Sequence, residues 1–155
     1  MLSLKNIYYH PSTAEEPVLT NLSLKCNTGK LTIVRGPSGS GKTTLLEVIS
    51  GLSDYQKGEM TWFNKTLNAK QRRRLCGLVF QFPERYFLGL SVGQELRLGH
   101  KKLTTEELIS TLSKVGLNNL DLKKSPESLS GGQQRRLAIA VQLLRSPNVL
   151  LLDEP

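Results

Sequence analysis

Short apolar runs separated by polar, glycine-rich stretches are spread along the whole chain, and their period predicts most of the strands. Apolar residues partly alternate over 2–9 and 18–26, which is typical of strands with one solvent-facing side. Further short strands are expected at 31–34, 59–63, 76–81 and 149–152. The mainly apolar runs at 31–34, 76–81 and 149–152 predict buried strands, and the run at 76–81 suits a strand covered on both faces of a parallel sheet.

Helical periodicity and helix-end signals appear between and after these strands. A helix is expected to begin near Lys42 and to end at Gly51, a residue type that favours the left-handed backbone at helix ends. Beyond Gln81 the pattern becomes helical, with hydroxyl residues followed three positions later by Gln or Glu at 91–94 and 104–107. Another helix begins at Ser130 and ends near 146–147. The order of elements predicts an α/β fold, with residues 84–126 as a helical insertion.

The composition is that of one folded domain. The chain has 155 residues, of which 38% are hydrophobic, and a mean hydropathy of −0.26. No stretch approaches the roughly 18 consecutive apolar residues of a membrane span, and the first residues do not have the layout of a signal peptide. Any role at a membrane is therefore expected to depend on a partner. Cys26 and Cys76 are expected to be small buried residues in a reducing compartment.

The formal net charge of +8 suggests an anionic partner, but the arrangement of the basic residues points to a solvated face. No aromatic residues are interleaved with them, as base-stacking surfaces would require. We therefore favour solvated lysines and arginines over nucleic-acid binding. The basic clusters are 72–74, 101–102, 123–124 and 135–136.

A glycine-rich stretch between the run at 31–34 and the following helix has the pattern of a phosphate-binding loop. Glycines let a polyphosphate approach the backbone closely, and a helix N-terminus offers unpaired N–H groups with partial positive charge. Lys42 would reach the β- and γ-phosphates, and the Thr43 hydroxyl would be a ligand of Mg²⁺. The expected nucleotide-binding residues are Gly36, Pro37, Ser38, Gly39, Ser40, Gly41, Lys42, Thr43 and Thr44.

Two acidic residues follow the last apolar run. Asp153 and Glu154 come directly after 149–152, and ligands bind at the carboxyl ends of parallel strands. Asp153 can hold Mg²⁺, and the neighbouring carboxylate of Glu154 can take a proton from an attacking water molecule.

A second anion-binding helix start, Leu129 to Gln133, resembles the signature motif of the ATP-binding-cassette (ABC) ATPases. The chain resembles this family in three further places: Gly36 to Thr43 correspond to its Walker A motif, Val149 to Glu154 to its Walker B motif, and Gln81 to its Q-loop. The resemblance implies a P-loop NTPase (RecA-like) core with an antiparallel β subdomain. The core would comprise 1–83 and 127–155, with the helical subdomain at 84–126. A complete cassette continues beyond Walker B, so we expect this chain to be an incomplete cassette domain.

The resemblance also implies partners and roles. Two subunits would pair head to tail and enclose ATP between one phosphate loop and the other subunit's signature residues, Ser130, Gly131, Gly132 and Gln133. Glu154 would be the general base. Gln81 would contact Mg²⁺ and the attacking water, and Thr43 and Asp153 would be the other metal ligands. Tyr9 matches the residue that stacks on adenine, although Tyr8 and His10 are near enough to leave the register open.

The stretch from Val79 to Phe87 is similar to energy-coupling-factor and cobalt-type importers and to their cyanobacterial and chloroplast relatives. Three rings beside Gln81, those of Phe82, Tyr86 and Phe87, form either a groove for a short partner helix or part of the helical insertion's own packing. The resemblance implies an ATPase subunit at the inner face of the plasma membrane, or in the chloroplast stroma, that serves a separate integral membrane transporter subunit. The alternatives are a soluble ABC protein that acts on ribosomes or DNA, and a fragment that only binds nucleotide.

Overall fold

The computed structural model describes residues 1–100 and 102–154. They form two compact units, Met1–Cys76 and Gly77–Pro155, and each is described here by itself. Lys101, from the expected basic pair at 101–102, and Pro155, the last residue of the expected domain, lie outside the described residues.

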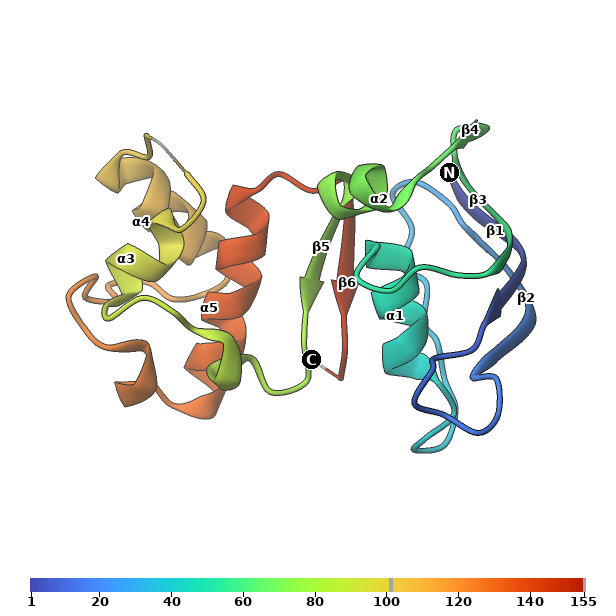
Figure 1. The fold of residues 1–155 in the computed structure, drawn as a ribbon. Helices are drawn as coiled ribbons and strands as arrows, with labels where there is room; N and C mark the ends of the chain where they lie inside the picture. Colours follow the sequence, from blue (N-terminus) through green and yellow to red (C-terminus); the bar gives the residue numbers. More distant parts are fainter. Residues whose placement is uncertain (101, 155) are drawn as a thin grey trace. The chain divides into compact units, whose positions relative to one another are not determined.

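The first unit is built on a four-stranded antiparallel sheet in the order β2-β1-β3-β4 (Figure 1). The register places Leu4 of β1 opposite Leu24 of β2 and Met60 of β3, and both Leu4 and Met60 are buried. The strands predicted at 2–9, 18–26 and 59–63 are therefore confirmed to within a few residues. The bounds are β1 Leu2–Tyr9, β2 Leu19–Cys26, β3 Lys57–Trp62 and β4 Lys65–Thr66.

Two helices complete the first unit. α1 (Lys42–Ser50) ends at Gly51, as predicted, where φ is 80° and the glycine N–H donates to the last turn of the helix. A Cβ atom on Gly51 would lie 2.5 Å from the carbonyl oxygen of Ala69, so the glycine also lets α2 (Ala69–Leu75) approach. The sequence analysis did not predict α2, which begins with a capping box between Asn68 and Gln71.

The apolar run at 31–34 does not form the expected buried strand. These residues belong to no helix or strand, and Leu31 and Ile33 are 86% and 63% exposed. An apolar run becomes a strand only when a neighbouring strand pairs with its backbone. Within residues 1–76 the sheet runs from β2 to β4 and does not include this segment. The phosphate loop therefore follows an unpaired segment in this unit.

Arg72 corrects the expectation of a solvated basic cluster at 72–74. Its side chain is completely buried, donates to the carbonyl oxygens of Val48 and Ser53, and pairs with Asp54. The guanidinium carbon also lies 4.9 Å from the centre of the Tyr55 ring. The last carbonyl groups of a helix lack partners within the helix and favour a cation, so Arg72 completes the C-terminal end of α1.

We expect Arg72→Ala to lower the free energy of unfolding by about 2 to 4 kcal/mol, because the Val48 and Ser53 carbonyl groups each lose one donor and a buried side chain is removed. The matched control is Arg74→Ala, since Arg74 lies on the same helix with an exposed side chain. Urea denaturation of the two variants measures the difference. Equal stability of both variants would show that the Arg72 contacts contribute nothing.

The second unit contains a two-stranded sheet and three α-helices. β5 (Cys76–Val79) and β6 (Val149–Leu152) pair and run in the same direction (Figure 1). Leu151 is buried, but Leu150 is 36% exposed, so the expectation of a wholly buried last strand is wrong. The reason is that β6 has one strand neighbour among the described residues of this sheet.

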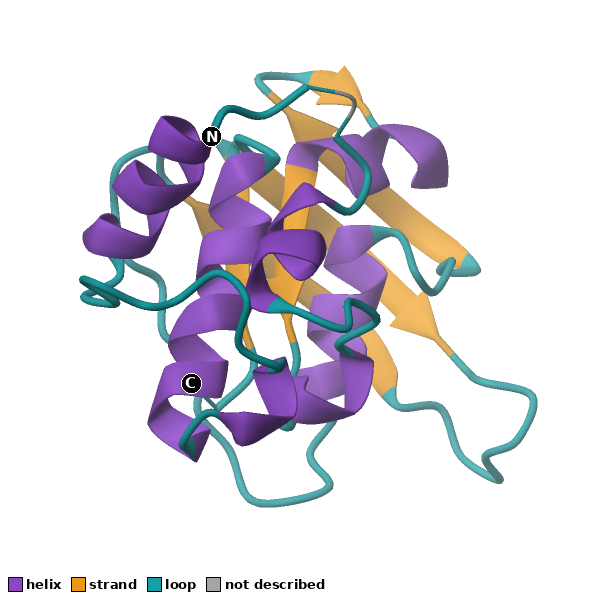
Figure 2. Cartoon of the chain, turned by 90° about the vertical axis from the view of Figure 1, so that its left-hand side faces the viewer, coloured by secondary structure: helices purple, strands orange, loops and turns teal. Residues whose placement is uncertain are grey.

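The helices of the second unit share one apolar core. α3 (Val92–Arg97), α4 (Thr105–Lys114) and α5 (Gly131–Leu144) form the helical part, drawn in purple in Figure 2, with short 3₁₀ turns at Pro83–Tyr86 and Pro126–Ser128. The capping box predicted at 104–107 is confirmed, whereas at 91–94 the Ser91 hydroxyl caps the helix and the Gln94 side chain accepts from Leu90 instead. The buried core residues are Val92, Leu96, Leu108, Leu112, Leu117, Leu129, Leu137 and Ala140.

Candidate functional site

The loop before α1 leaves the start of that helix open to an anion. Gly41 is the N-cap residue with φ 86°, and it supplies no side-chain hydrogen bond to the first turn, which also contains no acidic residue. Gly39 has φ 78°, and both angles lie in the region that favours glycine. A Cβ atom on Gly36 would lie 2.6 Å from the Ser40 hydroxyl oxygen. The backbone angles therefore favour glycine at positions 39 and 41, whereas a side chain at position 36 would require the Ser40 side chain to move.

Lys42 brings a positive charge to the same place. Its ammonium donates to the carbonyl oxygens of Gly36 and Pro37 at 3.1 and 3.0 Å, so the side chain folds back over the loop. Carbonyl oxygens are weaker acceptors than charged oxyanions, and a phosphate oxygen would be a stronger partner for this ammonium. Uncapped N–H groups, a helix N-terminus and a lysine together form an arrangement suited to a polyphosphate.

In the second unit, the ends of β5 and β6 bring two of the predicted catalytic residues together. The backbone N–H of Asp153 donates to the carbonyl oxygen of Val79 at 3.0 Å and fixes the register of the two strand ends. Nε2 of Gln81 then donates to Oε2 of Glu154 at 2.5 Å. Asp153 is 6% exposed, whereas Glu154 is exposed and has φ 47°. A buried and an exposed carboxylate therefore lie side by side at one strand end.

The start of α5 has the form expected for the signature motif. Ser130 is the N-cap, and its hydroxyl accepts from the backbone of Gln133 while the Gln133 side chain accepts from the backbone of Ser130. Gly131 and Gly132 are exposed, and a Cβ atom on either would meet nothing within 4 Å. Nothing in their surroundings within the described chain requires these two residues to be glycine.

Oxygen donors of the kind that Mg²⁺ prefers occur among the predicted metal ligands of each unit, taken by itself. Mg²⁺ is commonly held by one or two carboxylates together with substrate phosphates. The first unit offers the Thr43 hydroxyl, and the second unit offers the Gln81 amide oxygen and the Asp153 carboxylate. Residues 1–100 and 102–154 contain no cluster of three His, Cys, Asp or Glu side chains that could hold a metal ion. The chemistry of these donors fits Mg²⁺, and their roles as ligands stay predictions.

The aromatic residues singled out in the sequence are placed in different ways. Tyr9 is half-buried at the end of β1, opposite Leu19. Tyr86 is 55% exposed and stacks on Phe80 at 4.6 Å, and Phe82 is 43% exposed. Phe87 instead packs against the helical core. Packing within the helical insertion is therefore confirmed for Phe87, whereas Phe82 and Tyr86 are exposed and the groove for a partner helix stays a prediction.

Glu95 has a structural role in this region that sequence reasoning missed. Its carboxylate is 5% exposed and accepts from the backbone N–H groups of Leu88 and Gly89 at 2.8 and 2.7 Å. It also lines a cavity of about 120 Å³ beside Phe80 and Tyr86. No motif indicates this contact, because the sequence shows only an acidic residue near the start of a helix. Glu95 fixes the loop that follows the aromatic residues.

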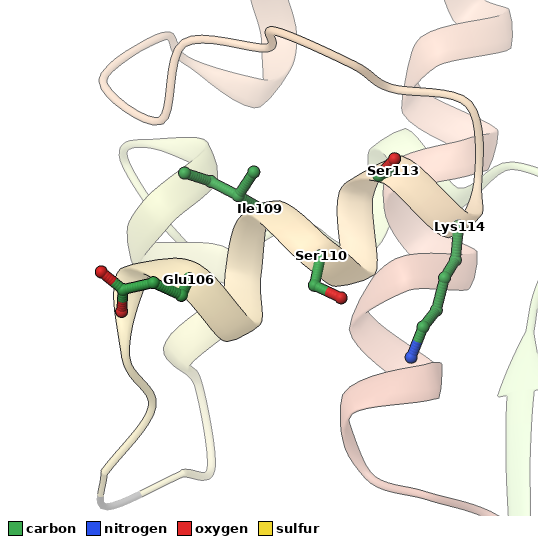
Figure 3. A pocket seen from close by; sticks show the side chains of 5 residues that line it. All are labelled: Glu106, Ile109, Ser110, Ser113 and Lys114. Carbon is green, nitrogen blue, oxygen red and sulfur yellow. The ribbon is translucent and has the colours of Figure 1, made fainter.

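A larger hollow lies on α4, and none of the predicted site residues lines it (Figure 3). All five lining residues belong to this one helix: Glu106, Ile109, Ser110, Ser113 and Lys114. A backbone hydrogen bond, followed by one from Thr104, lowers the pKa of the exposed Glu106 carboxyl. These bonds belong to the N-terminal capping of α4, so the shift reflects helix structure and not catalysis.

The glycine-rich loop that opens α1 and the two acids that follow β6 are the features of a P-loop α/β protein. The ABC transporter family matches residues 19–155, and this chain belongs to that family. The predicted fold class is confirmed.

Relatives of this chain agree with the finer resemblance. The chain is 32% identical to ABC transporter I family member 11, chloroplastic, of Arabidopsis thaliana, over 99% of this chain and 61% of that protein. It is 36% identical to the energy-coupling factor transporter ATP-binding protein EcfA2 of Lactobacillus gasseri, over 99% of this chain and 59% of that protein. The predicted similarity to energy-coupling-factor and cobalt-type importers is confirmed.

A solved structure has the same fold. CbiO1 of Clostridium perfringens, described as part of the ABC transporter complex cbiONQ, superposes with a TM-score of 0.86 at 29% identity. The match covers 99% of this chain and 65% of that one. The chain therefore spans about three fifths of the length of the curated relatives compared here.

Proposed function

We propose that this chain is the ATP-binding and ATP-hydrolysing subunit of an ABC transporter and that it couples hydrolysis to transport through a separate membrane protein. The observation that carries the proposal is the uncapped start of α1 with the Lys42 ammonium folded over its loop. Family membership supports it, because the relatives include ATP-binding proteins of energy-coupling factor transporters.

The residues at the site would act as follows. Backbone N–H groups of 36–44 bind the phosphates, and Lys42 neutralises the charge that develops on the transferred group. Thr43, Gln81 and Asp153 hold Mg²⁺, which, when bound, supplies electrostatic stabilisation of that charge. Glu154 accepts the proton of the attacking water. Tyr9 stacks on the adenine ring.

A second ATP-binding subunit would complete the site. Glycine in the first turn of a helix costs roughly 0.5 to 1 kcal/mol relative to alanine, so its presence at two successive positions calls for a reason. Gly131 and Gly132 have none within the described chain. We propose that the γ-phosphate of a nucleotide held by the partner's phosphate loop approaches this helix start, with Ser130 and Gln133 at its sides.

The membrane subunit would dock on an apolar surface of the second unit. Leu88 and Leu90 are 81% and 84% exposed, and the side chains of Glu95 and Gln94 fix the backbone of their loop. Exposed leucines on a fixed loop suit the apolar face of a short helix. No helix in residues 1–100 and 102–154 is long and apolar enough to cross a membrane. The proposed location is peripheral, at the inner face of the plasma membrane, with the chloroplast stroma as the alternative.

We expect Leu88→Asp to abolish co-purification with the membrane fraction while ATP turnover of the isolated protein stays within about twofold, because a charge on the exposed loop is incompatible with apolar docking. The matched control is Ile109→Asp, since Ile109 is 54% exposed on α4 and lies outside this surface. Immunoblotting of membrane fractions measures the effect. Equal membrane binding by both variants would contradict docking at the 88–90 loop.

The net charge of +8 favours a second candidate function, that of a soluble ABC protein acting on ribosomes or DNA. Recovery of the wild-type protein with ribosomes or DNA, and not with membranes, at moderate salt would favour this alternative over transport.

A further inference from the structure

The hydrogen bond between Gln81 and Glu154 joins two residues 73 positions apart in the sequence. They meet because Gln81 lies two residues beyond the end of β5 and Glu154 two residues beyond the end of β6, and the Asp153 N–H is bonded to the Val79 carbonyl. The contact thus depends on the register of the two strand ends, and it involves an ionisable carboxylate that the structure exposes to solvent.

Glu154 has a backbone conformation that is uncommon for its residue type. Its φ of 47° lies in the left-handed region, which residues with a Cβ atom occupy at an energetic cost. Its carboxylate has no second hydrogen-bond partner among residues 1–100 and 102–154. An exposed glutamate side chain would otherwise sample several rotamers, so the Gln81 amide limits where this carboxylate can lie.

The Gln81 donor occupies one oxygen of the Glu154 carboxylate and leaves the other oxygen available. Hydrogen bonds to ionised acceptors are the stronger class, and this one engages Oε2. The other oxygen, Oε1, is left to accept a proton. An amide is suited to this task because it donates through nitrogen without carrying a charge and keeps a carbonyl oxygen at its other end.

We propose that Gln81 is a positioning residue that holds the Glu154 carboxylate in the orientation in which it takes a proton. The inference rests on the proposed function, in which Glu154 is the base. The family resemblance implies that Gln81 contacts the metal ion and the attacking water. The proposal gives Gln81 one further contact, the hydrogen bond to the Glu154 side chain.

The kinetic test is a double-mutant cycle in the full-length protein. Misplacing a catalytic group can cost up to about 100-fold, so we expect Gln81→Ala to lower kcat by about 10- to 100-fold with KM for ATP within about twofold. Gln81→Glu should be at least as impaired, because two carboxylates would repel each other. In the Glu154→Gln background, Gln81→Ala should cause a smaller loss than in the wild-type background, because only the metal and water contacts of Gln81 remain to be lost. Independent, multiplying effects would overturn the proposal.

A spectroscopic readout separates this proposal from a general structural effect. In ¹⁵N-labelled protein without nucleotide, the side-chain amide resonances of Gln81 should move on Glu154→Ala, whereas those of Gln56, which donates to the His10 carbonyl, should not. Unmoved Gln81 resonances would contradict the bond.

Different results would contradict the base role of Glu154 and the positioning role of Gln81. If Glu154→Gln retains full turnover, the base assignment in the proposed function is wrong. If Glu154→Gln lowers turnover as expected but the effect of Gln81→Ala multiplies with it, only the positioning role is wrong.

Discussion

ATP turnover by the Lys42→Ala variant is expected to fall about 100- to 1000-fold, because the lysine supplies a preorganised positive charge where charge develops in the transition state. The Kd for ATP should rise about 10- to 100-fold, since a hydrogen bond between charged partners is lost. The fold should be unaffected, because the Lys42 ammonium contacts only two exposed carbonyl groups of its own loop.

Lys30→Ala is the matched control for this variant. Lys30 is an exposed lysine in the same unit, six residues before the loop. The substitution Lys30→Ala therefore removes the same charge from the protein. Isothermal titration of each variant with ATP and a phosphate-release assay measure the two effects. If the Lys42→Ala variant binds and hydrolyses ATP as well as the wild-type protein, the phosphate-binding role assigned to the 36–44 loop is wrong.

The second large effect is expected for Glu154→Gln, which should lower turnover about 100- to 10,000-fold because an amide cannot accept the proton of the attacking water. ATP binding should stay within about twofold, since Glu154 is not assigned to the nucleotide or to the metal. The change is nearly isosteric, so the Gln81 contact loses its charge while the shape of the site is kept.

Glu127→Gln provides the control, because Glu127 is an exposed glutamate of the same unit in the turn at Pro126–Ser128. Single-turnover measurements separate the chemical step from product release. Full turnover by Glu154→Gln would refute the base assignment. Equilibrium ATP binding without hydrolysis by the wild-type chain would instead support the nucleotide-binding-only alternative.

Local signals in the sequence were sufficient for most elements of the fold. The alternation over 2–9 and 18–26 predicts β1 and β2, and the glycine at 51 marks the end of α1 because its backbone conformation is local. The loop at 36–44 is likewise encoded by nearby residues. Its glycines set the turn, and the following apolar residues set the helix.

Features that depend on distant partners could not be predicted in this way. The run at 31–34 has the composition of a strand, but strand formation also requires a paired neighbour, which sequence composition does not reveal. Arg72 looks like its neighbours Arg73 and Arg74 in the sequence. Only the packing of α2 against the end of α1 explains why it is buried.

The candidate site shows the same division. Gln81 and Glu154 were each singled out through motifs, but the hydrogen bond between them depends on the pairing of β5 with β6. Glu95 carries no motif, and its buried carboxylate gains its role only from the backbone N–H groups of Leu88 and Gly89. The specific roles of the predicted site residues stay predictions until variants are measured.

Under the proposed function, one chain carries two anion-binding sites, the loop at 36–44 and the start of α5, and each would contact a different ATP molecule. Gly131→Leu tests the second site cleanly, because a side chain there meets nothing within 4 Å of the added Cβ position and the helix tolerates it.

The most direct measurement is sedimentation velocity of the full-length Glu154→Gln protein with and without Mg²⁺ and ATP. We predict that ATP doubles the sedimenting mass, and that adding either Lys42→Ala or Gly131→Leu keeps the protein monomeric. A Glu154→Gln protein that is saturated with ATP and still sediments as a monomer would contradict the claim, as would a Gly131→Leu variant that dimerises normally.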